Sequence, residues 1–264
     1  MNEDVERQIQ SRLPGGARVL DVGGARERAR CATHVIDLLS YDEAHRAWEH
    51  LFRDYPIPKE NWAVHDICSS KPFPYEDKFF DFVICSHTLE DVRDPIRVCE
   101  ELSRVSKAGY IEVPSPVMEL TMGVEGGERW VGYAHHRWLI DLAGDQVTAL
   151  FKPHFLTAST RFHLAASHAE QLRKSCKHVA SLFWQGEIKA KEQVKVVREE
   201  LEAEIERIVR SESGDTPTMK AARLRRRAWS AGKQLVESLH MTETIRPLVV
   251  TLQKLLRSSA LRGN

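Results

Sequence analysis

The sequence lacks the features that would place it in a membrane or nucleic-acid-binding class. No run approaches the ~20 consecutive apolar residues needed to span a bilayer, and no N-terminal segment resembles a signal peptide. Lys plus Arg and Asp plus Glu both number 38 among the 264 residues, so net charge points to no polyanionic or acidic partner. We therefore expect a soluble, cytoplasmic protein that has no specific nucleic-acid partner.

Several chemical signatures are also missing. The five cysteines are odd in number and form no CxxC pair, which is typical of small buried hydrophobic side chains in a reducing compartment. The two phosphate-binding signatures, GxxxxGK[ST] and GxGxxG, are absent. The sequence therefore predicts neither a disulfide-stabilised fold nor a nucleotide site of those two kinds.

Five short apolar runs rich in valine and isoleucine follow one another in the first half of the chain. Each has apolar residues on both faces, which is typical of strands in a parallel sheet that is covered on both sides. Between the last two runs, residues 94–109 carry an apolar helical stripe that starts after Asp94-Pro95 and ends before Gly109. This alternation predicts an α/β fold with a doubly wound, Rossmann-like and mostly parallel sheet. Residues 137–151 are predicted to form a hairpin that supplies its antiparallel end.

The character of the chain changes after about residue 160. We predict a Rossmann-like domain over residues 1–160 and a C-terminal helical extension over residues 161–264. Its first amphipathic helix carries the apolar seam Val194, Val197, Leu201, Ile205 and Ile208, and residues 246–263 form another. Three roles stay open for this extension: a lid that also forms a homodimer through the C-terminal helices, docking of the basic segment 219–234 on a partner enzyme or an anionic polymer, and peripheral membrane contact.

Polar side chains follow four successive predicted strands at the point where each strand ends. These residues are Asp21, Asp37, Asp66, Ser86 and His87. Ligands of open parallel sheets bind outside the carboxyl ends of the strands, and Gly23 and Gly24 would let the first turn approach such a ligand closely. The alternative is that Asp21 and Asp37 are helix N-caps. An acidic residue directly after the first strand suits a cationic or hydroxyl-bearing ligand better than a pyrophosphate.

Residues 17–116 resemble the successive motifs of class I S-adenosylmethionine-dependent methyltransferases of the bacterial "methyltransferase type 11" kind. The matching motifs are "VLDVGG", "HVIDLL", "VHDICSSKPFPYEDKFFDFVICSHTLEDVRDP" and "ELSRVSKAGYIEVPSP". One departure is that Ala25 and Glu27 stand where the family has glycines in its x-Gly-x-Gly-x-Gly run. Another is Asp91, which stands where the family more often reads "LEHV".

The resemblance implies a role for each matching residue. Asp21, Gly23 and Gly24 would line the methionine end of S-adenosylmethionine, the expected cofactor. Asp37 would take the ribose hydroxyls, and Asp66 with Ile67 would hold the adenine. Ser86 and His87 would lie beside the sulfonium and the methyl acceptor.

A hydroxyl acceptor must lose a proton when it is methylated, and histidine is the commonest base for such a step. The candidates are His87, His135 and His136, of which the last two follow a glycine-rich segment, 122–133, that we interpret as a loop over the site. His135 and His136 with Asp141 or Glu112 also offer metal ligands. We expect no metal, because adjacent histidines in a strand point to opposite faces.

The sequence therefore predicts an S-adenosylmethionine-dependent methyltransferase that methylates an oxygen of a saccharide, a lipid-linked glycan or a secondary metabolite. Its partner would be that small-molecule or glycan acceptor. N-methylation is an alternative, since an amine needs less help from a base. A catalytically silent cofactor-binding scaffold that acts through its helical tail is a second alternative, favoured by the altered glycine-rich run.

Overall fold

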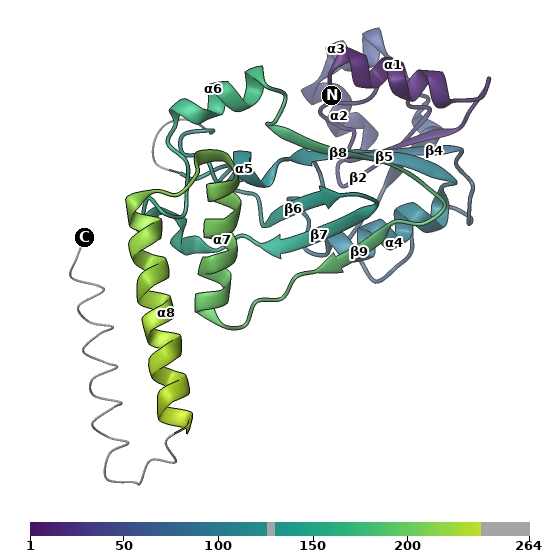
Figure 1. The fold of residues 1–264 in the computed structure, drawn as a ribbon. Helices are drawn as coiled ribbons and strands as arrows, with labels where there is room; N and C mark the ends of the chain where they lie inside the picture. The colour runs from purple at the N-terminus through teal and green to yellow at the C-terminus, as the bar shows by residue number, and fades with distance from the viewer. Residues whose placement is uncertain (126–129, 239–264) are drawn as a thin grey trace. The chain divides into compact units, whose positions relative to one another are not determined.

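The computed structural model describes residues 1–125 and 130–238 (Figure 1). The chain forms two compact units, Met1–Val196 and Val197–Asn264. All of the strands that the structure describes lie in the first unit, as do the predicted site residues.

The first unit is built on a six-stranded sheet with the strand order β3-β2-β1-β4-β5-β8. The five predicted strands are present and run parallel, which confirms the doubly wound α/β fold; the sixth strand, β8, is antiparallel to β5. The bounds are β1 (Val19–Val22), β2 (His34–Asp37), β3 (Trp62–Val64), β4 (Phe82–Ser86), β5 (Ala108–Pro114) and β8 (Val179–Gln185).

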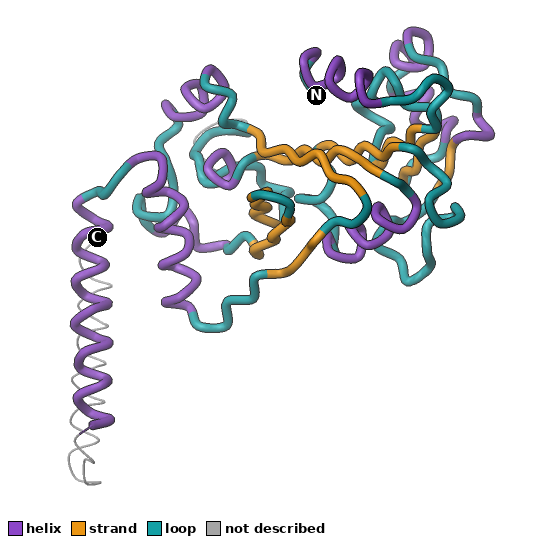
Figure 2. The backbone as a smooth tube through the Cα atoms, turned by 45° about the vertical axis from the view of Figure 1, so that its right-hand side comes forward, coloured by secondary structure: helices purple, strands orange, loops and turns teal. Residues whose placement is uncertain are grey.

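Alternate residues of the central strands pack on opposite sides of this sheet. Figure 2 shows helices above and below it. On one side, Val19 and Ile84 pack with Ile9 of helix α1 (Glu3–Arg12). On the other side, Leu20 and Val83 belong to a larger core that includes helix α4 (Pro95–Val105). Because both faces are covered, β1 and β4 must be apolar on both faces, as their sequences are.

The hairpin predicted over residues 137–151 forms, but it does not join the main sheet. Strands β6 (Trp138–Ala143) and β7 (Gln146–Phe151) pair around the predicted turn and belong to a second sheet, in the order β6-β7-β9, with β9 (Lys189–Glu192). The prediction that this hairpin ends the main sheet is therefore wrong. Strand β8 takes that place through a seven-residue ladder with β5.

Local sequence signals account for most helix ends in the first unit. Asp94 caps α4 by accepting a hydrogen bond from the Arg97 N–H at 2.9 Å, and Ser40 with Glu43 forms a capping box at the start of α2. The remaining helices are α2 (Tyr41–Ala47), α3 (Glu49–Asp54), α5 (Pro116–Glu119), α6 (Ser167–Lys174) and the 3₁₀ turns η1 (Lys59–Asn61) and η2 (His154–Ala158).

The structure divides the chain at residue 196 rather than at residue 160. Residues 161–196 were predicted to begin a helical extension, yet they supply α6, β8 and β9. The amphipathic helix was predicted to include Val194 and Val197, but it starts only at Arg198. Residues shortly before it form β9, which pairs with β7. Val194 and Val197 are accordingly exposed.

The second unit contains helices α7 (Arg198–Ser213) and α8 (Pro217–Ser238). Helix α7 ends at Gly214, whose φ of 69° is the left-handed conformation that glycine adopts readily, and the Gly214 N–H bonds the Arg210 carbonyl at 2.9 Å. The helix predicted over 246–263 lies outside the described residues. None of the helices within the described ranges is long and apolar enough to cross a membrane.

Gly109 was predicted to punctuate the end of a helix, but it lies inside β5, and α4 ends earlier at Val105. A Cβ there would lie 2.6 Å from the Val83 carbonyl oxygen and 2.8 Å from the Trp184 ring. We expect Gly109→Ala to lower the free energy of unfolding by about 1–3 kcal/mol through overpacking, measured by urea denaturation. Gly15→Ala is the control, because nothing lies within 4 Å of a Cβ at that position. Equal stability of the two variants would contradict the prediction.

Candidate functional site

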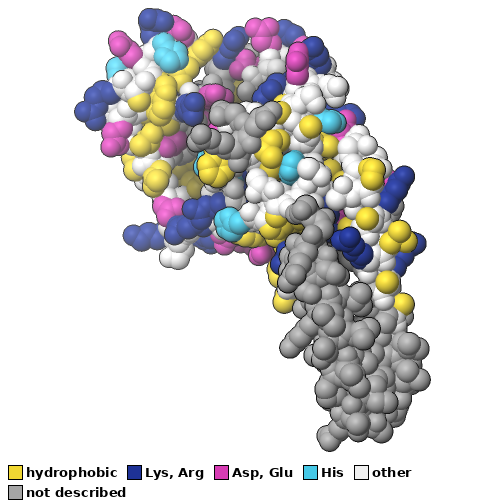
Figure 3. Space-filling view, turned by 90° about the vertical axis from the view of Figure 1, so that its left-hand side faces the viewer, with side chains coloured by type: hydrophobic (Ala, Val, Ile, Leu, Met, Phe, Trp, Pro, Cys, Tyr) yellow, Lys and Arg dark blue, Asp and Glu magenta, His cyan; other side chains and the backbone are white. Residues whose placement is uncertain are grey.

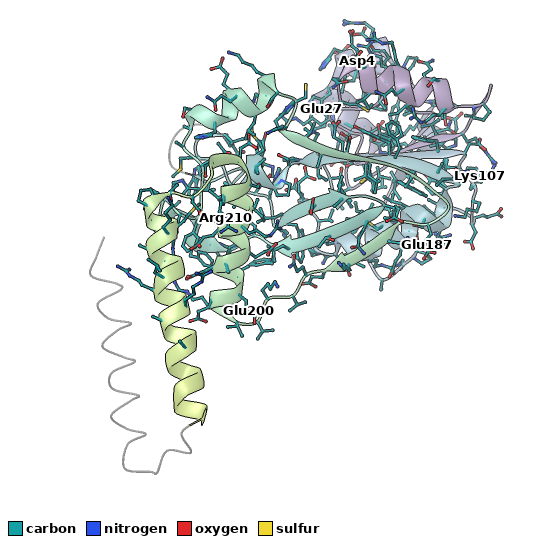
Figure 4. The ribbon with its side chains drawn as sticks, in the orientation of Figure 1. Asp4, Glu27, Lys107, Glu187, Glu200 and Arg210 are labelled. Atoms are coloured by element: carbon teal, nitrogen blue, oxygen red, sulfur yellow. The ribbon has the colours of Figure 1, made fainter. Side chains whose placement is uncertain are left out.

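The strand order brings the predicted strand-end residues to one edge of the main sheet. Strands β3, β2, β1 and β4 are neighbours, so four predicted residues lie at the carboxyl ends of adjoining strands. Asp37 and Ser86 end β2 and β4, Asp21 is the last residue but one of β1, and Asp66 lies two residues beyond β3. The opposite edge is marked by Lys107, directly before β5, and Figure 4 shows Lys107 and Glu27 at opposite ends of the sheet. A reversal of strand order lies between β1 and β4, which is where ligands of such sheets bind.

Asp21 is the most deeply buried of the predicted site residues, with 2% of its surface exposed. Its Oδ2 accepts a hydrogen bond from the Ala29 N–H at 2.7 Å. Burial raises the pKa of Asp21 to about 7, although the Ala29 N–H and the nearby Arg28 charge both lower it. This carboxylate is therefore desolvated and only partly compensated, which suits it to a cationic ligand group.

Arg28, which sequence reasoning missed, is the buried cation beside Asp21. It is 6% exposed, it donates from Nη2 to the carbonyls of Leu51, at 3.1 Å, and Tyr55, and it lies over the Phe52 ring. Its Nε and Nη1 have no hydrogen-bond partner among the described residues. Unpaired buried donors are costly, so they point to a missing acceptor. The only sequence signal was an arginine four residues after the glycine pair.

A cavity of about 430 Å³ opens beside these two residues. Its walls come from the ends of β1 and β4, the loop after β1, and the helices α1 and α3. Asp21, Ser86 and Arg28 line it together with Glu27, Trp48 and Tyr55. Such a volume suits a ligand of nucleoside size. Of the residues predicted to bind a cofactor, only Asp21 and Ser86 are among those that line it.

Gly23 and Gly24 are required by the packing of the loop itself. Gly23 has a φ of 79°, and a Cβ there would lie 2.6 Å from the Thr88 hydroxyl oxygen. A Cβ at Gly24 would lie 2.8 Å from the carboxyl carbon of Asp21. The glycines thus let the loop close on Asp21 and Thr88, which is a different reason from the direct ligand approach that we predicted.

Asp37 is the last residue of β2, and both of its carboxylate oxygens accept hydrogen bonds from backbone N–H groups. Oδ2 accepts from the Ala25 N–H at 3.1 Å, and Oδ1 accepts from the Leu39 N–H at 2.9 Å. Each oxygen keeps a second lone pair for a ligand hydroxyl. Asp37 therefore holds the loop after β1 in place and can still accept a further hydrogen bond.

Asp66 lies two residues beyond the end of β3 and is exposed. Its Oδ1 accepts from the Cys68 N–H at 3.0 Å, and its Oδ2 forms an ion pair with Arg93 at 2.6 Å. Ile67 packs partly against the main core. Asp66 and Ile67 thus lie at the predicted edge but outside the lining of the cavity.

His87 follows β4 and lies between two buried carboxylates. Its Nδ1 is 3.5 Å from Glu90 Oε1, and its Nε2 is 3.5 Å from Glu112 Oε1, which also accepts from the Ser86 hydroxyl at 3.3 Å. Burial lowers the pKa of His87, but the two carboxylates outweigh it and raise the pKa to about 9. His87 is therefore protonated at neutral pH, so it holds a proton rather than a free lone pair.

His136 lies in the loop before β6 with its side chain buried. Its Nδ1 is 2.5 Å from Glu119 Oε1, and the other oxygen of Glu119 accepts from Lys152 Nζ at 2.6 Å. Lys152 also donates to the Tyr133 carbonyl at 2.7 Å. Burial lowers the pKa of His136, while the carboxylate of Glu119 raises it, and the net shift is upward. The carboxylate of Glu119 thus fixes the orientation of the imidazole.

His135 and His136 converge, contrary to our expectation for adjacent histidines. They precede β6 rather than lying in it, so strand alternation does not separate them. Their rings are 4.4 Å apart, and both face Asp91, whose carboxylate lies with their ring nitrogens within 4.8 Å. The carboxylate beside both histidines is therefore that of Asp91. The two carboxylates predicted as further metal ligands lie elsewhere, since Asp141 is exposed in β6 and Glu112 contacts His87.

The surface shown in Figure 3 carries basic, acidic and histidine side chains side by side over its coloured part. It presents no broad area of one charge sign there, in keeping with equal numbers of acidic and basic residues in the sequence.

Comparison with known proteins identifies the domain that carries this site. Residues 20–111 match the family model described as a methyltransferase domain. This match spans β1 to β5 and confirms the predicted resemblance to S-adenosylmethionine-dependent methyltransferases and, with it, the predicted cofactor. No curated protein matches the chain.

Solved structures of similar fold cover only part of the chain. A SAM-dependent methyltransferase from Aquifex aeolicus is 24% identical with a TM-score of 0.30, over 42% of this chain and 64% of that one. The YcgJ protein of Bacillus subtilis is 16% identical with a TM-score of 0.33, over 43% of this chain and 52% of that one. The N-terminal domain of EvdMO1, solved with SAH and D-fucose, is 15% identical with a TM-score of 0.37, over 70% of this chain and 82% of that one. The chain spans about half the length of several of the structures that it matches.

The protonation of His87 can be measured directly. We expect its imidazole to titrate near pH 9 by NMR, because Glu112 and Glu90 stabilise the cation. Its contribution to stability should be complete below its unfolded pKa of about 6.5 and should be lost as the pH rises through 9. Glu112→Gln should move the midpoint toward 6.5, whereas Glu187→Gln, at an exposed position, should leave it unchanged. A wild-type midpoint near 6.5 would show that Glu90 and Glu112 do not stabilise the His87 cation, and it would contradict the prediction.

Proposed function

We propose that this chain, whose residues 20–111 match a methyltransferase domain, transfers a methyl group from S-adenosylmethionine to an oxygen of a saccharide, lipid-linked glycan or secondary metabolite. The observation that carries the cofactor assignment is that the Asp21 carboxylate and an Arg28 guanidinium with two unpartnered nitrogens among the described residues line one cavity. A buried carboxylate and a buried guanidinium match the ammonium and the carboxylate at the methionine end of the cofactor.

The altered glycine-rich run does not argue against this assignment. Ala25 and Glu27 replace two glycines of the family, but Ala25 contributes its backbone N–H to Asp37 and Glu27 lines the cavity. The turn that needs glycine is made at Gly23 and Gly24. In the proposed complex, Asp37 would bond the ribose hydroxyls with its remaining lone pairs, and Asp66 with Ile67 would border the adenine.

When bound, the cofactor supplies a sulfonium methyl group whose carbon an acceptor lone pair attacks in line with the C–S bond, and the sulfur leaves with the electron pair of that bond. The protein has to orient the acceptor and accept its proton. Protonated His87 can orient or donate, but it is not a base at neutral pH. We therefore place deprotonation of the acceptor at the cluster of Asp91, His135 and His136.

The carboxylates after β4 and β5 support a polar acceptor. Glu90, Asp91, Glu119 and Glu125 surround the histidine pair or lie beside it, and carboxylates accept hydrogen bonds from hydroxyl groups. The same charges suit an amine, so N-methylation is the second candidate. Mass spectrometry of a panel of sugars and amines incubated with the protein and cofactor separates the two. Cofactor binding without any transfer or cofactor hydrolysis would favour the silent scaffold.

The remaining proposals concern the second unit and the location of the protein. Its basic helix α8 supports docking on a partner or an anionic surface. A homodimer through the C-terminal helices stays a proposal, and Ile205 and Val209 of α7 are already buried within the single chain. We keep the cytoplasm as the proposed compartment.

Isothermal titration tests the cofactor assignment. We expect S-adenosylmethionine and S-adenosylhomocysteine to bind and NAD not to bind. Arg28→Gln should weaken binding about tenfold or more, because it removes a charged hydrogen bond worth ~1.5–3 kcal/mol. Arg53→Gln, at an exposed position on the neighbouring helix α3, is the control, and thermal unfolding checks that each variant is folded. Unchanged affinity in Arg28→Gln would remove Arg28 from the pocket.

Asp21 makes cofactor affinity depend on pH. With a pKa of about 7, roughly one carboxyl in ten is ionised at pH 6 and nine in ten at pH 8. Since a cationic ligand group needs the ionised form, affinity for S-adenosylhomocysteine should rise about tenfold over this range. Asp21→Asn should remove the dependence on pH. The same variant should stabilise the free protein at pH 8, because it removes a buried charge; a pH-independent wild type would contradict the argument.

A further inference from the structure

Three side chains from two separate segments meet beside the proposed acceptor site. Asp91 lies five residues beyond the end of β4, and His135 and His136 precede β6. Asp91 Oδ2 is 3.8 Å from His135 Nε2, and Asp91 Oδ1 is 3.9 Å from His136 Nε2. These separations are too long for hydrogen bonds. Two ligand atoms that each lie about 2.1 Å from one metal ion are separated by roughly 3–4 Å, which is close to the spacing found here.

The outer nitrogen of each imidazole faces another carboxylate. His136 Nδ1 is 2.5 Å from Glu119 Oε1, and His135 Nδ1 is 3.4 Å from Glu125 Oε1. A neutral imidazole that donates from Nδ1 has a lone pair on Nε2. Both Nε2 atoms would then turn a lone pair toward the Asp91 carboxylate. Carboxylates that hold the outer nitrogen while the inner nitrogen binds an ion are the usual surroundings of metal-bound histidines.

One oxygen of Asp91 has no hydrogen-bond donor. Asp91 Oδ1 is buried and accepts no hydrogen bond from the described residues. Two of the nearby cations are already engaged, since Lys152 donates to Glu119 and to the Tyr133 carbonyl, and His87 lies between Glu90 and Glu112. A buried carboxylate oxygen without a hydrogen bond is costly, and a cation bound between Asp91 and the histidines would remove that cost.

The backbone holds the two segments together. The Glu90 carbonyl accepts from the N–H groups of Arg137, at 2.8 Å, and Trp138, at 3.2 Å, and Trp138 Nε1 donates to the Val92 carbonyl at 2.8 Å. On the other side of the histidines, Gly132 has a φ of 64° and passes so close to Glu119 that a Cβ would lie 2.3 Å from its carbonyl oxygen. The three side chains are thus placed by fixed backbone rather than by chance rotamers.

We propose that Asp91, His135 and His136 bind one divalent transition-metal ion, with Glu119 and Glu125 orienting the two imidazoles. Two imidazole nitrogens and one carboxylate oxygen form a ligand set that suits zinc. Three protein ligands leave at least one coordination position open. In a step that rests on the proposed function, an acceptor oxygen would take that position, and the ion would lower the pKa of its hydroxyl group so that the proton could pass to water.

Zinc binding by the full chain tests this proposal without any methyl acceptor. After treatment with EDTA and dialysis, the protein should bind one zinc ion in competition with a chromophoric chelator. His135→Ala and Asp91→Asn should weaken binding by at least tenfold, and Glu119→Gln by roughly 10- to 100-fold. His168→Gln is the matched control, because that histidine contacts only the Ala165 carbonyl at 3.2 Å among the contacts that the structure describes. His135 is 57% exposed, so its substitution leaves the fold intact, as thermal unfolding would check.

Zinc should also raise the melting temperature of the wild type and not that of His135→Ala. The absence of zinc binding, or binding that His135→Ala and Asp91→Asn leave unchanged, would overturn the proposal. Titration of S-adenosylhomocysteine into the zinc-free protein separates this result from the proposed function. Cofactor binding without zinc binding would refute the metal site alone, whereas zinc binding that the variants weaken would support the site even if the cofactor did not bind.

Discussion

The desolvated carboxylate of Asp21 is the constraint on which the cofactor side of the site depends. It lies one residue before the end of the central strand β1, on the face that α1 covers, and among the described residues only the Ala29 N–H donates a hydrogen bond to it. Gly24 makes room for this carboxylate, because a Cβ at that position would clash with it. The charge of Arg28 lowers the pKa of Asp21 and so favours its ionised form. The loop after β1 is therefore shaped around a buried negative charge. Its burial costs stability in the free protein, and a bound cation would repay that cost, which is common at functional sites.

The acceptor side depends on a different balance of charge. Buried carboxylates gather after β4 and β5, and two of the cations beside them are already engaged. His87 lies between Glu90 and Glu112, and Lys152 is bonded to Glu119. This arrangement leaves Asp91 with the histidine pair as its neighbours and no hydrogen bond to one oxygen. The two halves of the site therefore differ. The cofactor side offers a buried carboxylate and a buried guanidinium to a ligand, whereas the acceptor side offers a carboxylate and two imidazoles to a cation.

The sequence was sufficient for the features that depend on local pattern. Apolar runs with polar ends predicted β1 to β5, and Asp94-Pro95 predicted the start of α4, because burial on both faces and capping leave a direct mark on residue type. Strand β9 left no such mark: "KAKE" at an exposed edge is as polar as a helix surface, and its pairing with β7 is a long-range contact. Strand β8 was missed because its place beside β5 depends on register across more than sixty residues. Arg28 could not be recognised either, since its acceptors are the carbonyls of Leu51 and Tyr55 in a separate segment.

The histidines show most clearly why chemistry cannot be assigned from residue type alone. The sequence offered His87, His135 and His136 as candidate bases, and their surroundings in the structure differ. Two carboxylates keep His87 protonated, and Glu119 occupies one nitrogen of His136. Protonated His87 cannot take a proton from a hydroxyl group, which is why we assign deprotonation to the cluster of Asp91, His135 and His136. A metal ion held by these three residues would assist that step, because it would lower the pKa of the oxygen that it binds so that the proton could pass to water.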